Sequence, residues 1–526
     1  KSVDNIPASL IDKVEVITSP SAKYDPDGMA GIINIVLKKG KYEGFNGSLK
    51  INGKSNDNAG MGDMNGFTAY GNYRGEKWNL YSSVNLNNRL RIMEGGRQVY
   101  TTYLDDSTPD SIDFSFLNNS NRVGNSFKFG ADYSINEHLI VNGEINYDQH
   151  LHDGVNTQTL KLPEPGIKIV NDGDFDDNYD VEGYFDINQT FDNPDQEFNF
   201  SLSYDYQKDN ELESLSLVSD TTILFQDIQG INIDLSYKYP VSENSKMEMG
   251  YDGRLNDNIE KMNFEITETA DVFQGNNTFG YKRSIHGFFF EYDYKLNDKF
   301  SIKPSMRYEY VSKNISFKSD YTGEATSNLY GKILNSLEDS VYVDDYHTFY
   351  PDLHFTYNLT EKQSLQFGLS NRVNRPGDGG HGGGSRQIRP FPRDVYSDNF
   401  VFVGNPFLKP EYSTQYELSF KSPLPMGFAY VNLYYHQLEN VIEWYDDDRF
   451  DRSDILTFRN ADSGENMGIE IFTMLMGQTL GGGYNLNKLE DPSGDYELNG
   501  NSQRINLYSR INLPEEYIKL FSFEFG

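Results

Sequence analysis

Apolar and polar residues alternate with a period of two along most of this chain. Phe45, Gly47, Leu49 and Ile51 alternate with polar neighbours, and the same pattern recurs at residues 78–86, 127–133, 139–147, 198–206, 231–239, 247–255, 300–310, 353–359 and 416–420. A period of two places successive side chains on opposite faces of a β-strand. About nineteen such strands of roughly ten residues are predicted, which is the length that a tilted strand needs to cross a bilayer.

The connections between these strands alternate between short and long. Short turns are predicted at residues 74–76, 134–137, 192–196, 240–246, 296–299, 359–362, 422–426 and 513–516. Long polar segments are predicted at residues 93–123, 151–180, 210–226, 256–280, 316–346, 375–410 and 439–467. The pattern predicts an all-β fold, a large antiparallel transmembrane β-barrel whose long loops are extracellular. A soluble sandwich or propeller has no reason to keep its long loops at one end.

The first forty residues have a different pattern. A short amphipathic turn is expected at residues 8–13, followed by strands at residues 14–18 and 32–37. Both strands are apolar almost throughout, as is typical of strands covered on both faces. We therefore expect a small α+β unit that something larger surrounds.

The amino-acid sequence of this segment resembles that of a known family. The runs IPASLIDKVEVI and PSAKYDPDGMAGIINIVLKK resemble the last third of the plug domain of TonB-dependent outer-membrane receptors, in the version common among Bacteroidetes. The matching positions are Val14 to Val16, Gly28, Ala30-Gly31, Ile33 to Ile35 and Lys38, with Val14 where the family more often has Ile. A second run, GNPFLKPE from Gly404 to Glu411, resembles a barrel motif of the same family that leads into the next strand.

The resemblance implies a domain division and a partner. Residues 1–40 would be the C-terminal part of the plug domain and residues 41–526 the outer-membrane barrel. The family has about 22 strands, so we expect a fragment that lacks the start of the plug and the last barrel strands. The resemblance also implies uptake driven by a TonB-type periplasmic energy-coupling protein, and contact with outer-membrane lipid and lipopolysaccharide.

Charge, cysteine content and motifs argue against several classes of function. The formal charge of -33 argues against nucleic acid as a partner, and a chain without cysteine has neither disulfides nor thiolate metal sites. No HExxH or GxSxG motif is present, so an enzyme is not expected. The mean hydropathy of -0.65 does not separate a soluble protein from a barrel with a polar lumen.

Ligand-contact candidates are predicted in two long loops. Residues 375–410 contain a glycine-rich run with His381, Arg386 and Arg389, for which a packed or flexible loop is the alternative. Trp444, Tyr445 and Asp446 lie at an acidic loop tip that would suit a sugar or a peptide, although an ordinary charged loop has the same composition.

Metal sites have weaker support. Asp172, Asp174 and Asp176 alternate as in a calcium loop, but the glycine and the glutamate of an EF-hand are missing and a solvated acidic loop is the alternative. His150 and His152 could point the same way, without a third ligand in reach. We expect no cofactor other than this calcium candidate.

Two functions are consistent with these features, and a soluble secreted β-protein is a third hypothesis. The first is a receptor for energised uptake of an unidentified solute, with the plug held by wetted polar contacts that a pull can break. The second is a plugged barrel that does not transport and serves as a structural or docking subunit of a larger outer-membrane assembly, with a surface lipoprotein or other envelope subunits as partners.

Overall fold

The computed structural model describes most of the chain. The described residues are 11–17, 21–27, 32–37, 43–54, 64–101, 110–162, 166–215, 220–268, 271–322, 333–334, 337, 339–377, 387–391, 401–446, 455–475, 478–490, 502–511 and 521–525. Within these ranges, no helix has the length and apolar character needed to cross a bilayer.

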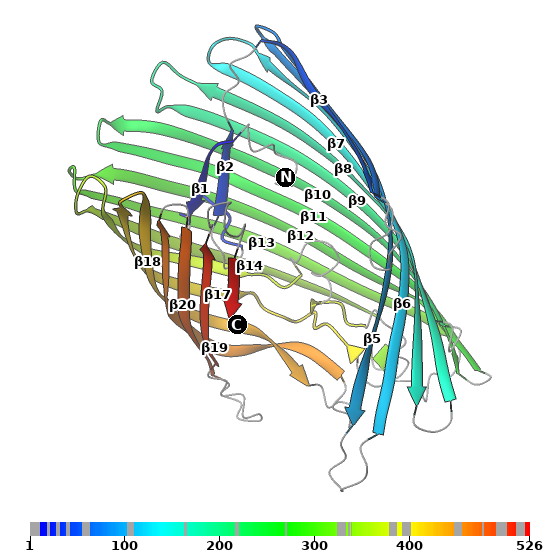
Figure 1. The fold of residues 1–526 in the computed structure, drawn as a ribbon. Coiled ribbons are helices and arrows are strands. Elements are labelled where there is room, and N and C mark those ends of the chain that lie inside the picture. The colour runs from blue at the N-terminus through cyan, green and yellow to red at the C-terminus, as the bar shows by residue number, and fades with distance from the viewer. Residues whose placement is uncertain are drawn as a thin grey trace.

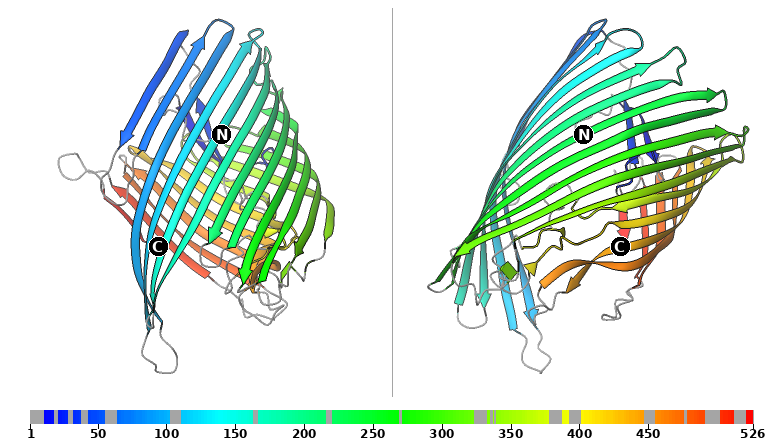
Figure 2. Two further views of the ribbon diagram at one scale, coloured as in Figure 1. Left: turned by 90° about the vertical axis from the view of Figure 1, so that its right-hand side faces the viewer. Right: turned by 180° about the vertical axis from the view of Figure 1, so that it is seen from behind.

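The strands form one closed barrel with a small hairpin inside it (Figures 1 and 2). The hairpin consists of β1 (Ile11–Ile17) and β2 (Ile32–Leu37). The barrel strands are β3 (Gly44–Lys54), β4 (Met64–Arg74), β5 (Trp78–Thr101), β6 (Asp110–Ser134), β7 (Leu139–Leu162), β8 (Gly166–Thr190), β9 (Glu197–Leu215), β10 (Asp220–Ser242), β11 (Ser245–Glu268), β12 (Asp271–Lys295), β13 (Phe300–Thr322), β14 (Ser340–Asn358), β15 (Ser364–Asn374), β16 (Val401–Phe402), β17 (Glu411–Leu424), β18 (Gly427–Asp446), β19 (Ile455–Leu475), β20 (Gln478–Glu490), β21 (Ser502–Ile511) and β22 (Phe521–Phe525). Without the two-residue β16, nineteen barrel strands lie in the described part of the chain, which is the number that the alternation predicts.

Strand register explains why apolar and polar residues alternate. One row across the wall contains only apolar and aromatic side chains, paired in the order Tyr133, Val141, Ile187, Phe200, Leu235, Tyr251, Phe288, Tyr308 and Phe349. Leu235, Phe288 and Phe349 in this row are exposed. The neighbouring row on the opposite face contains Asp132, Asn142, Asp186, Ser201, Asp234, Asp252, Gly287, Glu309 and Thr348. The first row faces outward and the second faces the lumen, because Asp252 and Glu309 contact groups inside the bore.

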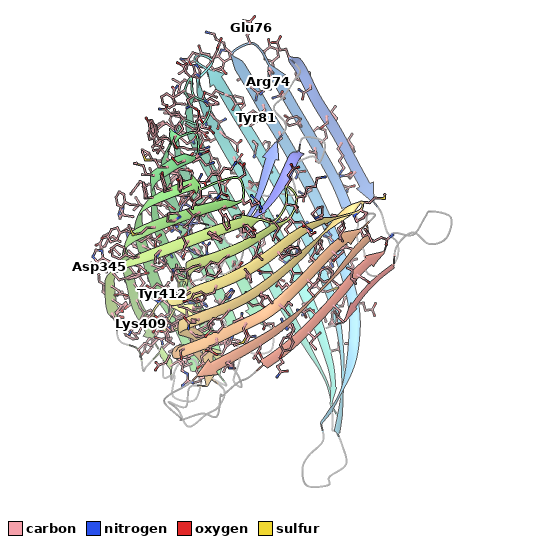
Figure 3. All side chains as sticks on the ribbon, turned by 90° about the vertical axis from the view of Figure 1, so that its left-hand side faces the viewer. Arg74, Glu76, Tyr81, Asp345, Lys409 and Tyr412 are labelled. Carbon is pink, nitrogen blue, oxygen red and sulfur yellow. The ribbon has the colours of Figure 1, made fainter. Side chains whose placement is uncertain are left out.

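The turns are short at one end of the barrel, which we call the short-turn end. Turns such as Gly75 to Lys77 and Glu243 to Asn244 join consecutive strands there, in agreement with the predicted short turns, of which 513–516 lies outside the described residues. Figure 3 labels Glu76 at this end and Lys409 nearer to the opposite, long-hairpin end.

The prediction of strand length is wrong. Many strands are twice as long as expected, and β5 to β8 each contain 24 or 25 residues. Residues assigned to polar loops continue the ladders, as in the pairing of Val99 with Ile112 in the predicted loop 93–123. Polar side chains are compatible with strands that extend beyond the apolar belt, because the backbone ladder does not require an apolar face. Residues 11–13 also belong to β1 rather than to a turn.

The wall is interrupted between β14 and β15. Their ladder ends at Leu353 and Leu369. Strand β14 extends beyond this point, from Leu353 back to Ser340, toward the long-hairpin end. The short strands β15 and β17 pair fully with each other. On the other side of this interruption, β16 pairs in parallel with the start of β19. Residues 387–391 and 401–405 are hydrogen-bonded to one another and to β19 at this part of the rim.

Candidate functional site

A loop between β1 and β2 docks on the inner face of β11 to β15. We call residues 21–27 the plug loop. The backbone N–H of Ala22 donates a hydrogen bond to Ser305 Oγ on β13 (3.2 Å), and Lys23 Nζ lies 2.7 Å from Glu248 Oε1 on β11. These contacts place the plug loop inside the bore, as Figure 1 shows for the adjoining hairpin.

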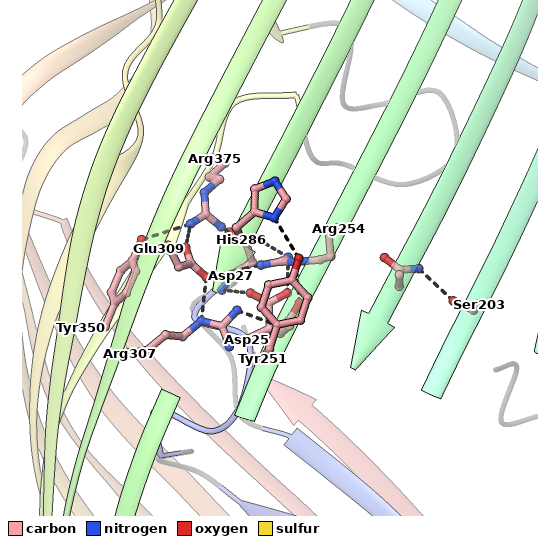
Figure 4. A network of polar contacts seen from close by, with 12 residues as sticks. Asp25, Asp27, Ser203, Tyr251, Arg254, His286, Arg307, Glu309, Tyr350 and Arg375 are labelled. Atoms are coloured by element: carbon pink, nitrogen blue, oxygen red, sulfur yellow. Dashed lines mark hydrogen bonds and ion pairs between the residues drawn. The ribbon is translucent and has the colours of Figure 1, made fainter. Parts of the chain in front are cut away.

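Two aspartates of the plug loop bind arginines of the wall (Figure 4). Asp27 accepts from Arg254 Nη1 at 2.7 Å and forms a second ion pair with Arg375. Asp25 forms an ion pair with the same nitrogen of Arg254. The Asp27 side chain is 19 % exposed and that of Asp25 is 39 % exposed, so Asp27 is the better shielded partner.

The wall supplies its own carboxylates to the same arginines. Arg307 lies 2.7 Å from Glu309 and 2.8 Å from Asp252, and neither Arg307 nor Glu309 is exposed. Arg375 pairs with Glu309 and donates to the Tyr350 hydroxyl at 3.1 Å. Three guanidinium groups thus face two carboxylates of the wall and two of the plug loop. We call this set of seven charged residues the ionic lock.

Gly287 makes room for this arrangement. It lies between Asp252 and Glu309 in the lumen-facing row. A Cβ at this position would come within 2.5 Å of Arg307 Nη2. The missing side chain therefore allows Arg307 to extend across β12 to Asp252 on β11.

The two plug-loop aspartates differ in their preference for protons. Burial by itself raises the pKa of Asp27, but Arg375 and Arg254 outweigh it and hold that pKa below the usual value of a carboxyl. Burial, followed by the adjacent charge of Asp27, raises the pKa of Asp25. Asp27 is thus the carboxylate whose charge the lock stabilises.

The plug loop also pairs with the wall through its backbone. The N–H of Val373 on β15 donates to the carbonyl of Pro26 (3.0 Å), and Asp27 forms an isolated parallel bridge with Val373. Val373 lies beyond the point where β14 stops pairing with β15. The plug loop therefore occupies the edge that β14 leaves open.

A second set of contacts lies toward the long-hairpin end, where loop residues fold into the bore. Arg389 is buried, and its Nη1 lies 2.7 Å from Glu260 Oε2 on β11. Its guanidinium lies 5.3 Å from the centre of the Phe391 ring. Glu260 accepts a further hydrogen bond from Gln226 at 3.2 Å.

An apolar cluster surrounds this ion pair. Lumen-facing side chains of β10 to β13 pack against loop residues 334, 388 and 391, and the cluster consists of Leu224, Met262, Phe264, Phe273, Phe279, Tyr281, Ile315, Phe317, Leu334, Ile388 and Phe391. The alternation suggests a lumen that is polar along its whole length. The structure differs, because loop residues that fold inward turn this section into a packed core. We give the name cap to these loop residues together with the wall side chains against which they pack.

The GNPFLKPE run fixes the cap to two sides of the rim. Asn460 on β19 accepts from the N–H of Lys409 at 2.8 Å and donates to its carbonyl at 3.0 Å. Asn405 donates to the carbonyl of Phe458 (3.0 Å), and Lys313 on β13 donates to the carbonyl of Leu408 (3.2 Å). The run spans from β13 to β19 across the short strands, which gives this motif a structural role.

The predicted ligand-contact residues have different outcomes. His381 and Arg386 lie outside the described residues. Arg389 is committed to Glu260 inside the cap, which favours the packed-loop alternative for this residue. Trp444 is 47 % exposed, and its ring centre lies 4.0 Å from that of Phe458 and 5.1 Å from that of Phe402. Tyr445 and Asp446 continue β18, and their side chains lie outside the described residues.

The calcium candidates lie on strand β8 instead of in a loop. Asp174 Oδ2 is 2.6 Å from His152 Nε2, which explains the orientation of that histidine. Asp176 is in register with His152, and the side chain of Asp172 lies outside the described residues. The part of the chain that is described contains no group of three or more His, Cys, Asp or Glu side chains arranged to hold a metal ion.

The sequence model described as the outer membrane protein beta-barrel family matches residues 189–523, which is more than half of the chain. The chain belongs to the outer membrane protein β-barrel family. A search of curated protein sequences gives no match.

Solved structures with a similar fold are outer-membrane receptors. The alcaligin receptor FauA from Bordetella pertussis has 13% identity and a TM-score of 0.55, over 97% of this chain and 73% of that one. The ferric yersiniabactin uptake receptor FyuA from Yersinia pestis has 14% identity and a TM-score of 0.58, over 95% and 70%. The siderophore receptor PirA from Pseudomonas aeruginosa has 14% identity and a TM-score of 0.51, over 98% and 79%.

These findings confirm the predicted fold and the predicted location in the outer membrane. The chain is an integral outer-membrane β-barrel with the fold of the TonB-dependent receptors that its first forty residues resemble. At 12–14% identity the similarity to solved structures concerns the fold. The short-turn end is accordingly periplasmic and the long-hairpin end extracellular.

Proposed function

We propose that this outer-membrane β-barrel protein is a receptor for energised uptake of a solute, with the ionic lock as the contact that a periplasmic TonB-type protein breaks. The observation that carries the proposal is the plug loop itself. It holds to the wall through ion pairs of Lys23, Asp25 and Asp27 and through hydrogen bonds of its backbone, and not through a packed apolar core. Ionic contacts can be exchanged for others, whereas an apolar core would have to be exposed.

The lock is built so that its release leaves few unpaired charges. Arg254 Nε already lies 3.4 Å from Asp252 and its Nη2 lies 3.6 Å from Glu309. When Asp25 and Asp27 leave, three arginines remain with two wall carboxylates and only one positive charge is uncompensated. An uncompensated buried charge is the main cost of breaking such a pair, so this arrangement lowers the free energy of release.

The cap would act on the extracellular side. Arg389, Ile388 and Phe391 pack on the inner face of β10 to β13 above the lock, so a solute must pass or displace them. Trp444, which is 47 % exposed at the extracellular hairpin, supports a ligand contact there. An exposed aromatic face suits a sugar or peptide. We extend this proposed site to Tyr445 and Asp446.

Cysteine labelling in cells tests the proposal without a known solute. The chain has no cysteine, so Ala22→Cys introduces a single thiol at a buried position of the plug loop. We expect a membrane-permeant maleimide to label it faster in energised cells than in cells treated with a protonophore. Asp298→Cys, in a periplasmic turn with a fully exposed side chain, is the control and should be labelled equally in both. Equal labelling of Ala22→Cys in the two states, or no effect of deleting the coupling protein, would contradict energised release.

A further inference from the structure

One wall of the bore, on β7 to β10, is acidic on its lumen face. Lumen-facing positions alternate with those of the outward row, and on these strands they include carboxylates at Glu144, Asp148, Asp180, Glu182, Asp186, Asp205, Asp209 and Asp234. Within lumen-facing positions of 142–152, 174–186, 201–211 and 224–234 there is no Lys or Arg. Lys238, nearer to the periplasmic end, is the next cation in the same phase on β10.

Besides Asp148 on β7, three of these carboxylates have no partner among the described residues. Asp186 and Asp234 both lie opposite Ser201, and Asp205 lies opposite Glu182 and Gly230. None of the three forms a hydrogen bond or ion pair with the described part of the chain. By contrast, Glu144 is paired with Lys128 of β6 at 3.2 Å. The unpaired charges therefore concentrate on β8 to β10, next to the ionic lock.

An independent observation points to a missing donor. Asn146 is 6 % exposed, and its Nδ2 donates to Glu144 Oε1 at 3.2 Å and to Glu182 Oε2 at 3.1 Å. Its amide oxygen is buried and accepts no hydrogen bond. A buried acceptor without a donor costs free energy unless something binds it. Here that acceptor lies beside Glu144 and Glu182, and Glu182 lies opposite the unpaired Asp205.

We propose that this acidic wall binds the cationic groups of the transported solute, namely ammonium or guanidinium groups, during passage beside the plug. The inference rests on the proposed function, because it takes the bore as the path of the solute. Such groups carry several N–H donors and a positive charge, which match carboxylates and an amide oxygen. The described residues provide no set of ligands for a metal ion, so an organic cation fits better. An anionic solute would be repelled along the same wall.

Binding of spermine to the purified full-length receptor in detergent tests the inference. The wall variant carries Asp186→Asn, Asp205→Asn and Asp234→Asn, which keep the side-chain shape and remove three charges. Each charge in a watery bore is worth roughly a factor of two to three, so we expect about tenfold weaker spermine binding by titration calorimetry. If the wall variant does not fold, Asp205→Asn alone should weaken binding by about twofold to threefold.

The matched control removes the same charge from the periplasmic turns, through Asp192→Asn, Asp195→Asn and Asp298→Asn. It should bind spermine as the parent does, and citrate should bind to none of the proteins. Equal affinities of the wall and control variants, citrate binding as tight as that of spermine, or no spermine binding by the parent would each overturn the inference. These measurements need no energy source, so their failure would leave the labelling test of plug release intact.

Discussion

Replacing Asp27 by Asn should loosen the plug loop far more than the same change at Asp25. Asp27 is the more buried carboxylate and contacts two arginines, whereas Asp25 is 39 % exposed and contacts one. Removing one partner of a buried ion pair costs about 3 kcal/mol, which corresponds to roughly a hundredfold change in the docking equilibrium. Solvent screening should limit the effect of Asp25→Asn to about 1 kcal/mol or less.

The labelling rate of Ala22→Cys in detergent measures this equilibrium. The thiol reacts only when the plug loop opens, so the rate follows the open population when closing is fast. We expect Asp27→Asn to raise the labelling rate by about a hundredfold and Asp25→Asn to change it by at most about fivefold. Both variants remove one negative charge, so each controls for the net charge of the other. Equal acceleration by the two, or none by Asp27→Asn, would refute the account of the lock.

The same assay has an expected pH dependence. The docked-state pKa of Asp27 is lowered, so its contribution is fully present above about pH 4, the usual carboxyl value, and is lost as pH falls through the lower docked value. The docked-state pKa of Asp25 is raised, so docking gains free energy as pH falls through that raised value. The parent should therefore label more slowly on mild acidification and faster on strong acidification. Asp25→Asn should lose the first effect and keep the second. Both effects are measured from pH 8 to pH 3 as the Ala22→Cys rate divided by that of the exposed Asp298→Cys control, because the thiolate fraction itself falls with pH.

Three further outcomes follow from the wall and the cap. Phe200→Arg, in the outward row, should reduce the stability of the folded barrel in lipid vesicles by about 2 to 4 kcal/mol, whereas Ser201→Arg on the lumen face should have a mild effect, and equal effects would contradict the assignment of faces. Arg389→Met leaves Glu260 buried without its partner and should destabilise the cap by about 3 to 5 kcal/mol, visible as faster proteolysis of the extracellular loops. Adding Glu260→Gln should restore part of this loss, and additive losses would argue against a direct pair. Asn460→Ala removes two hydrogen bonds to Lys409 and should increase proteolysis of the GNPFLKPE run with little effect on lipid insertion.

The barrel was predictable from sequence because lipid and lumen impose opposite demands on neighbouring residues. The row that contains Val141 and Phe200 and the row that contains Asn142 and Ser201 follow directly from that alternation. Strand ends were not predictable in the same way. Beyond the apolar belt no lipid marks one face, so residues such as Val99 and Ile112 look like loop although they continue the ladder.

The ionic lock left only a weak signal in the sequence. Arg254, Arg307 and Arg375 lie at lumen positions, where long charged side chains are unexpected in a wet bore rich in Asn and Ser. Alternation identifies the face of Arg254 and Arg307, whereas Arg375 follows the end of β15. It does not show that the three converge on Asp25 and Asp27, more than two hundred residues away in the chain. The expectation of wetted contacts concerned the plug, whose Asp25 side chain is 39 % exposed, whereas Arg307 and Glu309 of the wall are fully buried.

The pairing of Pro26 with Val373 bears on how this protein matures. Where β14 diverges, the edge of β15 would present a bare N–H, and the plug loop supplies the missing acceptor. The plug loop is thus part of the hydrogen-bonded wall of the barrel, in addition to lying inside its bore. A barrel inserted into the membrane before its own N-terminal segment has arrived would carry a defect at this seam, so biogenesis should require the two parts to assemble together.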